Sequence, residues 1–169
     1  MTNIYEQVVR YNLYNANDKL VGETEITAPS FEQMTNTISG AGIMGEYEAP
    51  IPGMFSSAEI EIPFRVFDRE AAKLLKSSSM LYLRACVEGV DSSTHQTKKV
   101  QLKIAMNGRP KGVTIGTIGN GKTMDSSVKM ELTYYKHEFD GRTLFELDKL
   151  NGKHVVDGED QMAEINSMI

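Results

Sequence analysis

The stretch GTIGNGKTMDSSVKMELTYY, residues 116–135, decides the fold class, because its two halves favour different folds. Residues 116–123 match the phosphate-binding loop pattern G-x-x-x-x-G-K-[ST]. That motif binds phosphate only where a buried strand leads into it and a helix leads out of it. Here the residues that follow alternate between apolar and polar, which predicts a strand. We therefore predict that residues 108–125 form a glycine-rich hairpin loop and expect no nucleotide cofactor there.

Three segments show this alternation, which is typical of a strand with one buried face. They are 58–66 (AEIEIPFRV), 98–106 (KKVQLKIAM) and 127–135 (SVKMELTYY). The side chains predicted to face the core are Ala58, Ile60, Ile62, Phe64, Val66, Val100, Leu102, Ile104, Met106, Val128, Met130, Leu132 and Tyr134. Pro63 indicates a sheet edge or a bulge in the first segment. Further strands are predicted at 4–14, 18–27, 80–90 and 142–149, separated by turn residues.

Helical signal is limited to two short segments. Asp68 can cap the sequence REAAKLLKS, which predicts one short helix near 68–78. The sequence EDQMAEINSMI, after Gly158, predicts a short C-terminal helix that must dock on another element. Its apolar stripe comprises Met162, Ile165 and Ile169, with Glu159 and Asp160 in the first turn. The predicted fold class is mainly β (α+β), an antiparallel β-sandwich or half-barrel, as a single domain over residues 1–169.

Composition and spacing argue against several kinds of site. The 169 residues have a net charge of −5, which disfavours non-specific DNA binding by an external basic face. The single cysteine, Cys86, is expected to pack as a small side chain in a cytoplasmic protein, and no segment is apolar enough to insert into a membrane. The three histidines are widely separated and are expected to be solvated or on edge strands. We therefore expect no catalytic residues, no metal ligands and no cofactor.

One segment does not fit a simple loop. Residues 39–53, SGAGIMGEYEAPIPG, are rich in glycine and proline, yet they include Ile43, Met44, Tyr47 and Ile51. A long loop with apolar side chains is usually functional or covered by a partner. The sequence alone leaves two alternatives, a contact with another chain or packing against the protein's own core.

The last part of the chain carries a series of marks in a fixed order. They are Tyr-Tyr-Lys at 134–136, Asp-Gly at 140–141 and Val-Asp-Gly at 156–158, followed by Asp160 and the predicted terminal helix. In this order they resemble the C-terminal region of the major tail tube protein of contractile-tailed bacteriophages and of related phage-tail-like bacteriocins. Upstream, the glycines around Met44 resemble the glycine-rich loop of that family. The family often has a proline between the residues matching Met44 and Gly45, and this chain does not.

The resemblance implies a structural protein and not an enzyme. Tail tube subunits form hexameric rings that stack into a hollow tube, and long hairpins from each subunit build one inner β-barrel. In this chain the hairpins would join 24–38 to 45–66 and 97–107 to 126–138. The resemblance also implies partners and a location: a contractile sheath, a baseplate hub, a tape-measure protein, passing double-stranded DNA, and a virion or bacteriocin tail assembled in the host bacterial cytoplasm.

Within that picture we predict two sets of residues. Contacts between subunits or rings are expected from Gly40, Gly42, Ile43, Met44, Gly45 and Tyr47. Side chains expected to face the lumen are Glu59, Glu61, Lys99, Gln101, Lys103, Lys129, Glu131 and Thr133. A monomeric β-barrel or sandwich that binds a small ligand is the alternative that the residues leave open, and a phosphate-loop nucleotidase is disfavoured.

Overall fold

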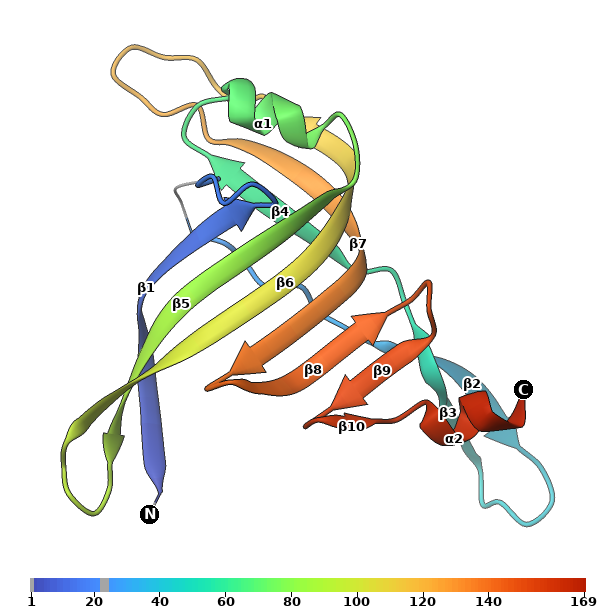
Figure 1. Cartoon of the computed structure of the whole chain (residues 1–169). Helices are drawn as coiled ribbons and strands as arrows, with labels where there is room; N and C mark the ends of the chain where they lie inside the picture. The colour runs from blue at the N-terminus through green and yellow to red at the C-terminus, as the bar shows by residue number, and fades with distance from the viewer. Residues whose placement is uncertain (1, 22–24) are drawn as a thin grey trace.

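The computed structural model describes residues 2–21 and 25–169, and strands dominate it (Figure 1). Strands account for 58% and helices for 7%. The elements are β1 (Asn3–Asn15), β2 (Gln33–Ser39), β3 (Glu46–Phe55), β4 (Glu59–Phe64), α1 (Arg69–Leu74), β5 (Ser79–Asp91), β6 (Thr97–Thr114), β7 (Ser126–Phe139), β8 (Arg142–Asp148), β9 (Lys153–Val156), β10 (Glu159–Asp160) and α2 (Ala163–Met168). The prediction of a mainly β chain with two short helices is confirmed.

Most of the strands belong to one antiparallel sheet with the order β1-β5-β6-β7-β8-β9-β10. β4 pairs with the first part of β7, and β8 pairs with its second part. The hairpin predicted between 97–107 and 126–138 is present as β6 and β7. The other predicted hairpin is present as a separate two-stranded sheet of β2 and β3, although β2 is much shorter than the predicted strand 24–38.

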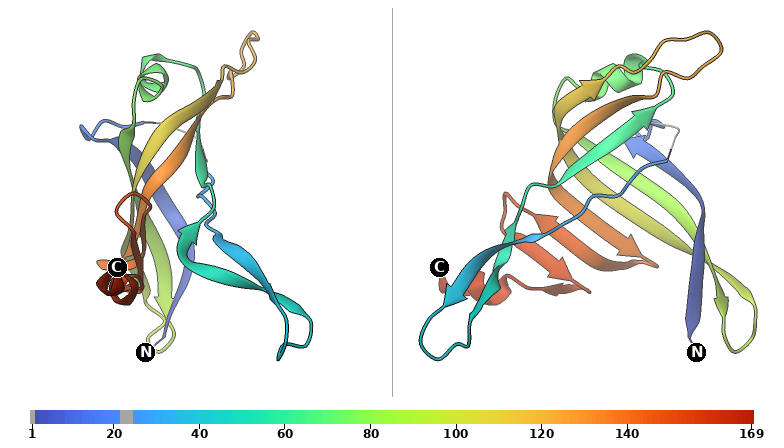
Figure 2. Two further views of the ribbon diagram at one scale, coloured as in Figure 1. Left: turned by 90° about the vertical axis from the view of Figure 1, so that its right-hand side faces the viewer. Right: turned by 180° about the vertical axis from the view of Figure 1, so that it is seen from behind.

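The large sheet curls around one hydrophobic core and does not close in a single chain. Ile60 and Ile62 of β4 share this core with Leu13 of β1 and Leu81 of β5. β4 therefore lies across the core from β1 and β5, although its hydrogen bonds go to β7 (Figure 2). This arrangement is the half-barrel that the alternating segments predict.

Helix α1 lies over one end of the curled sheet (Figure 1). The carboxylate of Asp68 accepts a hydrogen bond of 2.9 Å from the backbone N–H of Ala71, so the predicted N-cap is confirmed. Ala71 and Leu74 are buried in the core. The helix ends at Leu74, before the predicted end near residue 78.

A β-bulge in β7 changes which tyrosine faces the core. The pairing passes from Asn107 opposite Tyr134 to Gly108 opposite Leu132, so Thr133 is an extra residue. The alternation changes phase at this point, and Tyr135 is buried at 6% exposure. The prediction that Tyr134 faces the core is wrong, because one inserted residue moves the side chains that follow to the other face.

β6 continues into a segment predicted to be loop. Its last pair with β5 is Gly108 opposite Ser79. Beyond that pair, and among the described residues, β6 has β7 as its only strand neighbour, so Pro110 can occupy a position that needs no N–H donor. The connecting loop is therefore 115–125, and the prediction of a loop over 108–125 is wrong for its first part.

Two other predicted strands are shorter than expected. β4 ends at Phe64, so Val66 is 52% exposed and does not belong to the core. The strand predicted at 18–27 is wrong, because it is reduced to one isolated bridge between Leu20 and Tyr14; residues 22–24 of that prediction lie outside the described residues.

The first part of the segment predicted as a C-terminal helix forms a hairpin with β9. Asp157 and Gly158 have positive φ angles of 49° and 81°, which suit a tight hairpin turn. Glu159 and Asp160 consequently pair with β9, and the prediction that they form the first turn of a helix is wrong. Helix α2 begins at Ala163, and Ile169 is 96% exposed and not docked.

Candidate functional site

The hairpin of β2 and β3 projects away from the large sheet (Figure 2). All of its residues, which lie wholly in the described part of the chain, are at least partly exposed. Met34, Tyr47, Ile51 and Met54 are among its exposed apolar side chains, with Tyr47 at 54%. The prediction of a loop over 39–53 is wrong beyond Gly45, because β3 begins at Glu46. Its apolar side chains do not fold back over the core.

The predicted contact residues lie together at the tip of this hairpin. Gly40, Gly42 and Gly45 have φ angles of 134°, 89° and 97°, which residues with a Cβ rarely adopt. Met44 between them is fully exposed, and Ile43 is 36% exposed. The glycines therefore shape a turn that presents apolar side chains to solvent.

The base of the hairpin is held by an aromatic cluster. The Phe55 ring packs edge-on against His154 of β9, with ring centroids 5.0 Å apart, and against Phe145 of β8 at 6.3 Å. Gly53 lies directly under Met162, so a Cβ at this position would overlap the Met162 side chain. The base of the β2 and β3 hairpin thus packs against β8, β9 and the residue that precedes α2.

His154 is part of this cluster and is buried at 6% exposure. The prediction that the histidines are solvated or on edge strands is therefore wrong for His154, since β9 lies between β8 and β10. Burial lowers its pKa, and the carboxylate of Asp160 opposes that effect. A neutral His154 is the form that suits the aromatic contacts.

The outward face of β4 and β7 carries a network of opposite charges. Glu59 lies opposite Glu131, and the Lys111 ammonium is 2.9 Å from the Glu59 carboxylate and 3.6 Å from that of Glu131. Lys111 donates a hydrogen bond to Glu59, which lowers the pKa of Glu59 and raises that of Lys111. On the same face, Glu61 lies opposite Lys129 and accepts a 2.6 Å hydrogen bond from the Ser127 hydroxyl. The face is therefore mixed in sign.

The structure divides the eight predicted lumen residues into two groups. Glu59, Glu61, Lys129 and Glu131, with Thr133 at the bulge, lie on the β4 and β7 side. Lys99, Gln101 and Lys103 lie opposite residues of β5, which is across the core from β4. Because the core faces of β4 and β5 point toward each other, their outward faces point in opposite directions (Figure 2).

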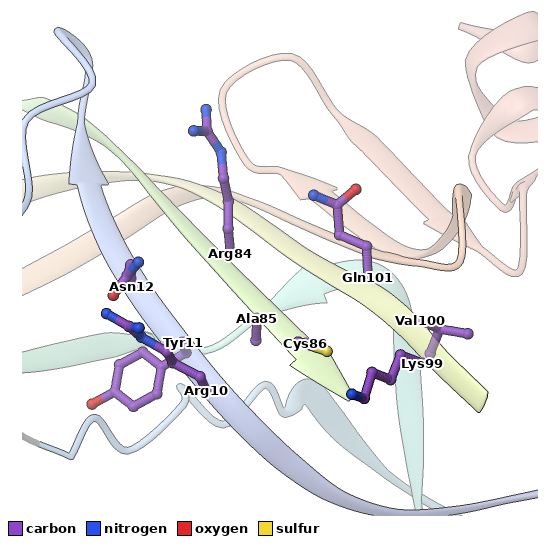
Figure 3. Close-up of a pocket in the computed structure, with 9 residues that line it drawn as sticks. All are labelled: Arg10, Tyr11, Asn12, Arg84, Ala85, Cys86, Lys99, Val100 and Gln101. Atoms are coloured by element: carbon purple, nitrogen blue, oxygen red, sulfur yellow. The ribbon is translucent and has the colours of Figure 1, made fainter. Parts of the chain in front are cut away.

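The second of these faces contains an open groove of about 450 Å³ over β1, β5 and β6 (Figure 3). Arg10, Arg84 and Lys99 supply its positive charges, and Cys86 and Gln101 lie between them. Arg84 forms an ion pair of 3.1 Å with Asp18, and Lys99 lies 4.0 Å from Glu88. Cys86 is half-buried, on the face opposite the core residues Ala85 and Val87.

The loop 115–125 carries the sequence that matches a phosphate-binding loop, but its surroundings are those of a hairpin. β7 begins at Ser126, so a strand follows the motif, as predicted. The N–H of Thr117 donates a 2.8 Å hydrogen bond to the carbonyl of Met124, which closes the loop. A Cβ on Gly116 would overlap that carbonyl. Backbone closure explains the first glycine of the motif.

Two other kinds of functional feature have no support in the described residues. Within residues 2–21 and 25–169, no three His, Cys, Asp or Glu side chains are placed to hold a metal ion. In the same part of the chain, neither helix has the length and apolar character needed to cross a bilayer.

Sequence reasoning missed three charged residues that the structure brings into these surfaces. Lys111 was placed in a loop, and its pairing with Glu59 depends on the extension of β6. Arg10 and Arg84 join Lys99 only through strand pairing, Arg10 lying opposite Cys86 and Arg84 opposite Lys103. The polar positions in the alternating segment 80–90 were the only local signal for Arg84.

Comparison with known proteins gives a match to one protein family over most of the chain. The sequence profile of the family described as phage tail tube protein FII matches residues 6–169. No curated protein matches the sequence. Among solved structures, a chain in the cryo-EM structure of the anti-feeding prophage (AFP) baseplate, 6-fold symmetrised, is similar with a TM-score of 0.43 and 9% identity, over 82% of this chain and 93% of that chain.

Proposed function

Because the chain belongs to the phage tail tube protein FII family, we propose that six copies close into a ring and that stacked rings form the inner tube of a contractile tail or tail-like bacteriocin. Membership of the family gives it a structural role in a virion tail, with other tube subunits as partners. Our proposal adds to this structural role the ring of six, the passage of DNA or ions through the tube, and assembly in the host cytoplasm. It also adds contacts with a sheath, a baseplate hub and a tape-measure protein.

The observation that carries this proposal is the uncovered hairpin of β2 and β3. A two-stranded hairpin is at best marginally stable alone in water, and within the described residues this one packs on its subunit at its base, around Phe55 and Gly53. In the described residues, the outer edges of β2, β3 and β4 have no strand partner. Pairing with neighbouring subunits would satisfy those edges and cover Tyr47, Ile51 and Met54.

Closure would give a channel wide enough for DNA. If each of six subunits adds about four strands, the barrel has about 24 strands, compared with the roughly 16 to 18 strands of porins that already enclose an aqueous channel. We assign the lumen to the β4 and β7 face, because β3 leads directly into β4 and both would line the same wall. Its mixed charges would hold DNA phosphate only weakly, since tight binding needs clustered cations.

The first test removes the tip of the hairpin. Residues 40–45 are replaced by Asn-Gly, which keeps Ser39 opposite Glu46 and closes a two-residue turn. The variant should remain folded by circular dichroism and form no long tubes by negative-stain electron microscopy. Tubes of normal length would refute the role of the tip.

A milder pair of variants separates contact from folding. Met44→Ser removes a fully exposed side chain at the tip, and Met168→Ser removes an exposed one on α2. Neither should change the unfolding temperature of the subunit, while only Met44→Ser should shorten the tubes. A wild-type protein that stays monomeric at all concentrations in sedimentation would refute the ring itself.

A further inference from the structure

We propose that the cationic groove over β1, β5 and β6 receives the acidic turn 157–160 of the next copy of this chain. This inference rests on the proposed ring and identifies one of the contacts between its subunits. It concerns the face that points away from β4, where the groove lies (Figure 3).

The groove is positively charged although the whole chain carries a net charge of −5. Arg10 has no ion pair within residues 2–21 and 25–169. The charges of Arg84 and Lys99 are only partly balanced. Arg84 has a single ion pair, with the exposed Asp18, and Lys99 lies 4.0 Å from Glu88. The site is therefore able to accept further negative charge.

The acidic turn offers the complementary charge. Asp157, Glu159 and Asp160 are all exposed. In the described part of the chain none of the three forms an ion pair, although Asp160 accepts a 2.9 Å hydrogen bond from the Met162 N–H. Three negative charges thus project at the β10 edge of the sheet.

The two charged sites lie at opposite edges of one sheet. β1 is the first strand of the order and β10 the last, so a head-to-tail ring brings the β10 edge of one subunit toward the β1 edge of the next. The two sites also lie at the same position along the strands. One row of ladder partners connects Asn12, Arg84, Lys103, Glu138 and Thr143 across the sheet. At the far end of this row, the N–H of Asp157 donates a 2.8 Å hydrogen bond to the carbonyl of Leu144 beside Thr143.

A protein segment fits the groove better than a DNA duplex does. The lining includes Cys86 and the amide side chains of Asn12 and Gln101 between the charged groups, so a polypeptide can be held by both charge and hydrogen bonds. Glu88 and Asp18 flank the groove and would repel a continuous row of phosphates. The interaction should also weaken with added salt, because it joins exposed charges.

The test reverses the charges of the groove and of the turn in two separate variants, which are the two halves of the experiment. The groove variant carries Arg10→Glu and Lys99→Glu, and the turn variant carries Asp157→Lys and Glu159→Lys. Each should raise the concentration needed for half-maximal ring formation by about tenfold. A combined variant with all four changes should assemble like the wild type, and an equimolar mixture of the two halves should form rings in which they alternate.

The native cysteine allows an independent measurement. If the turn enters the groove, Asp157→Cys should form a disulfide with Cys86 of the neighbouring copy, with two copper(II) phenanthroline complexes each accepting one electron and the two thiol protons passing to water. Asp125→Cys is the matched control, because Asp125 is also exposed and has a φ of 55° against 49° for Asp157. The control should give no such product, and neither should Asp157→Cys combined with Cys86→Ser.

The outcomes separate this inference from the ring proposal. Wild-type rings with no effect of either half variant, a combined variant no better than its halves, or no cross-link would each overturn the groove contact and leave the ring standing. A wild-type chain that forms no rings overturns both. Binding of a short fluorescent DNA duplex that is lost in the groove variant would assign the groove to nucleic acid and overturn the contact.

Discussion

Phe55 is the side chain that seats the projecting hairpin, and its replacement by alanine should detach the hairpin from the subunit. Phe→Ala at a fully buried site lowers the free energy of unfolding by about 3–5 kcal/mol, so a half-buried Phe55 contributes about 2 kcal/mol. The edge-on contacts with His154 and Phe145 add about 0.5–1.5 kcal/mol. The expected loss is about 3 kcal/mol, or about 6–12 °C in unfolding temperature for a domain of this size.

The assay is thermal and guanidinium unfolding at protein concentrations below those that permit assembly. Hydrogen exchange over residues 33–55 reports whether the hairpin leaves its seat before the core unfolds. Tyr47→Ala is the matched control, because Tyr47 is exposed on the same hairpin and its loss should change subunit stability by less than about 0.5 kcal/mol. A loss below about 1 kcal/mol for Phe55→Ala, with unchanged exchange over 33–55, would refute the seating role.

Three further predictions follow from buried or constrained residues. Burial lowers the pKa of His154 below 6.5, so the stability that neutral His154 contributes is complete above the pKa of the unfolded state and is lost as the pH falls toward the pKa of the folded state. His154→Phe should therefore reduce the drop in unfolding temperature between about pH 7.5 and about pH 5. His137→Phe serves for comparison, because burial lowers the pKa of His137 as well. Gly116→Ala should lower the free energy of unfolding by more than about 2 kcal/mol and Gly121→Ala by only about 1 kcal/mol, because both have positive φ but only the first meets a backbone carbonyl; equal losses in chemical denaturation would contradict this. Lys122→Ala should leave tube length unchanged, and ATP with magnesium should not raise the unfolding temperature of the wild type; a saturable rise would restore the nucleotide site.

Local alternation predicts most of the strands because each has one face in the core. Ile60, Ile62, Val128 and Met130 are all buried as predicted, since neighbouring positions in a half-buried strand face opposite environments. The short helix after Asp68 can also be predicted from the sequence, because the capping hydrogen bond joins residues that are close in the chain. These features need no knowledge of which strands pair.

What the sequence could not reveal depends on pairing. The bulge at Thr133 leaves no local mark, because tyrosines occupy both positions that follow and either could face the core. Pro110 and its flanking glycines are typical of a loop, and only the end of the β5 pairing at Gly108 explains why a strand tolerates them. The two exposed polar faces look alike in sequence, and only the curl of the sheet separates Glu59 from Lys99.

Prolines lie in two of the strands that have a free edge. Pro50 and Pro52 lie in β3 and Pro63 lies in β4, so each removes one N–H donor from a strand that has an unpaired edge in the described part of the chain. A missing donor limits the strands that can pair there and the registers they can adopt. Together with the net charge of −5, this would keep unassembled subunits from joining edge to edge at random. A neighbouring subunit in the proposed ring can still pair, because its register is fixed by contacts elsewhere, and closure then removes the exposed edges altogether.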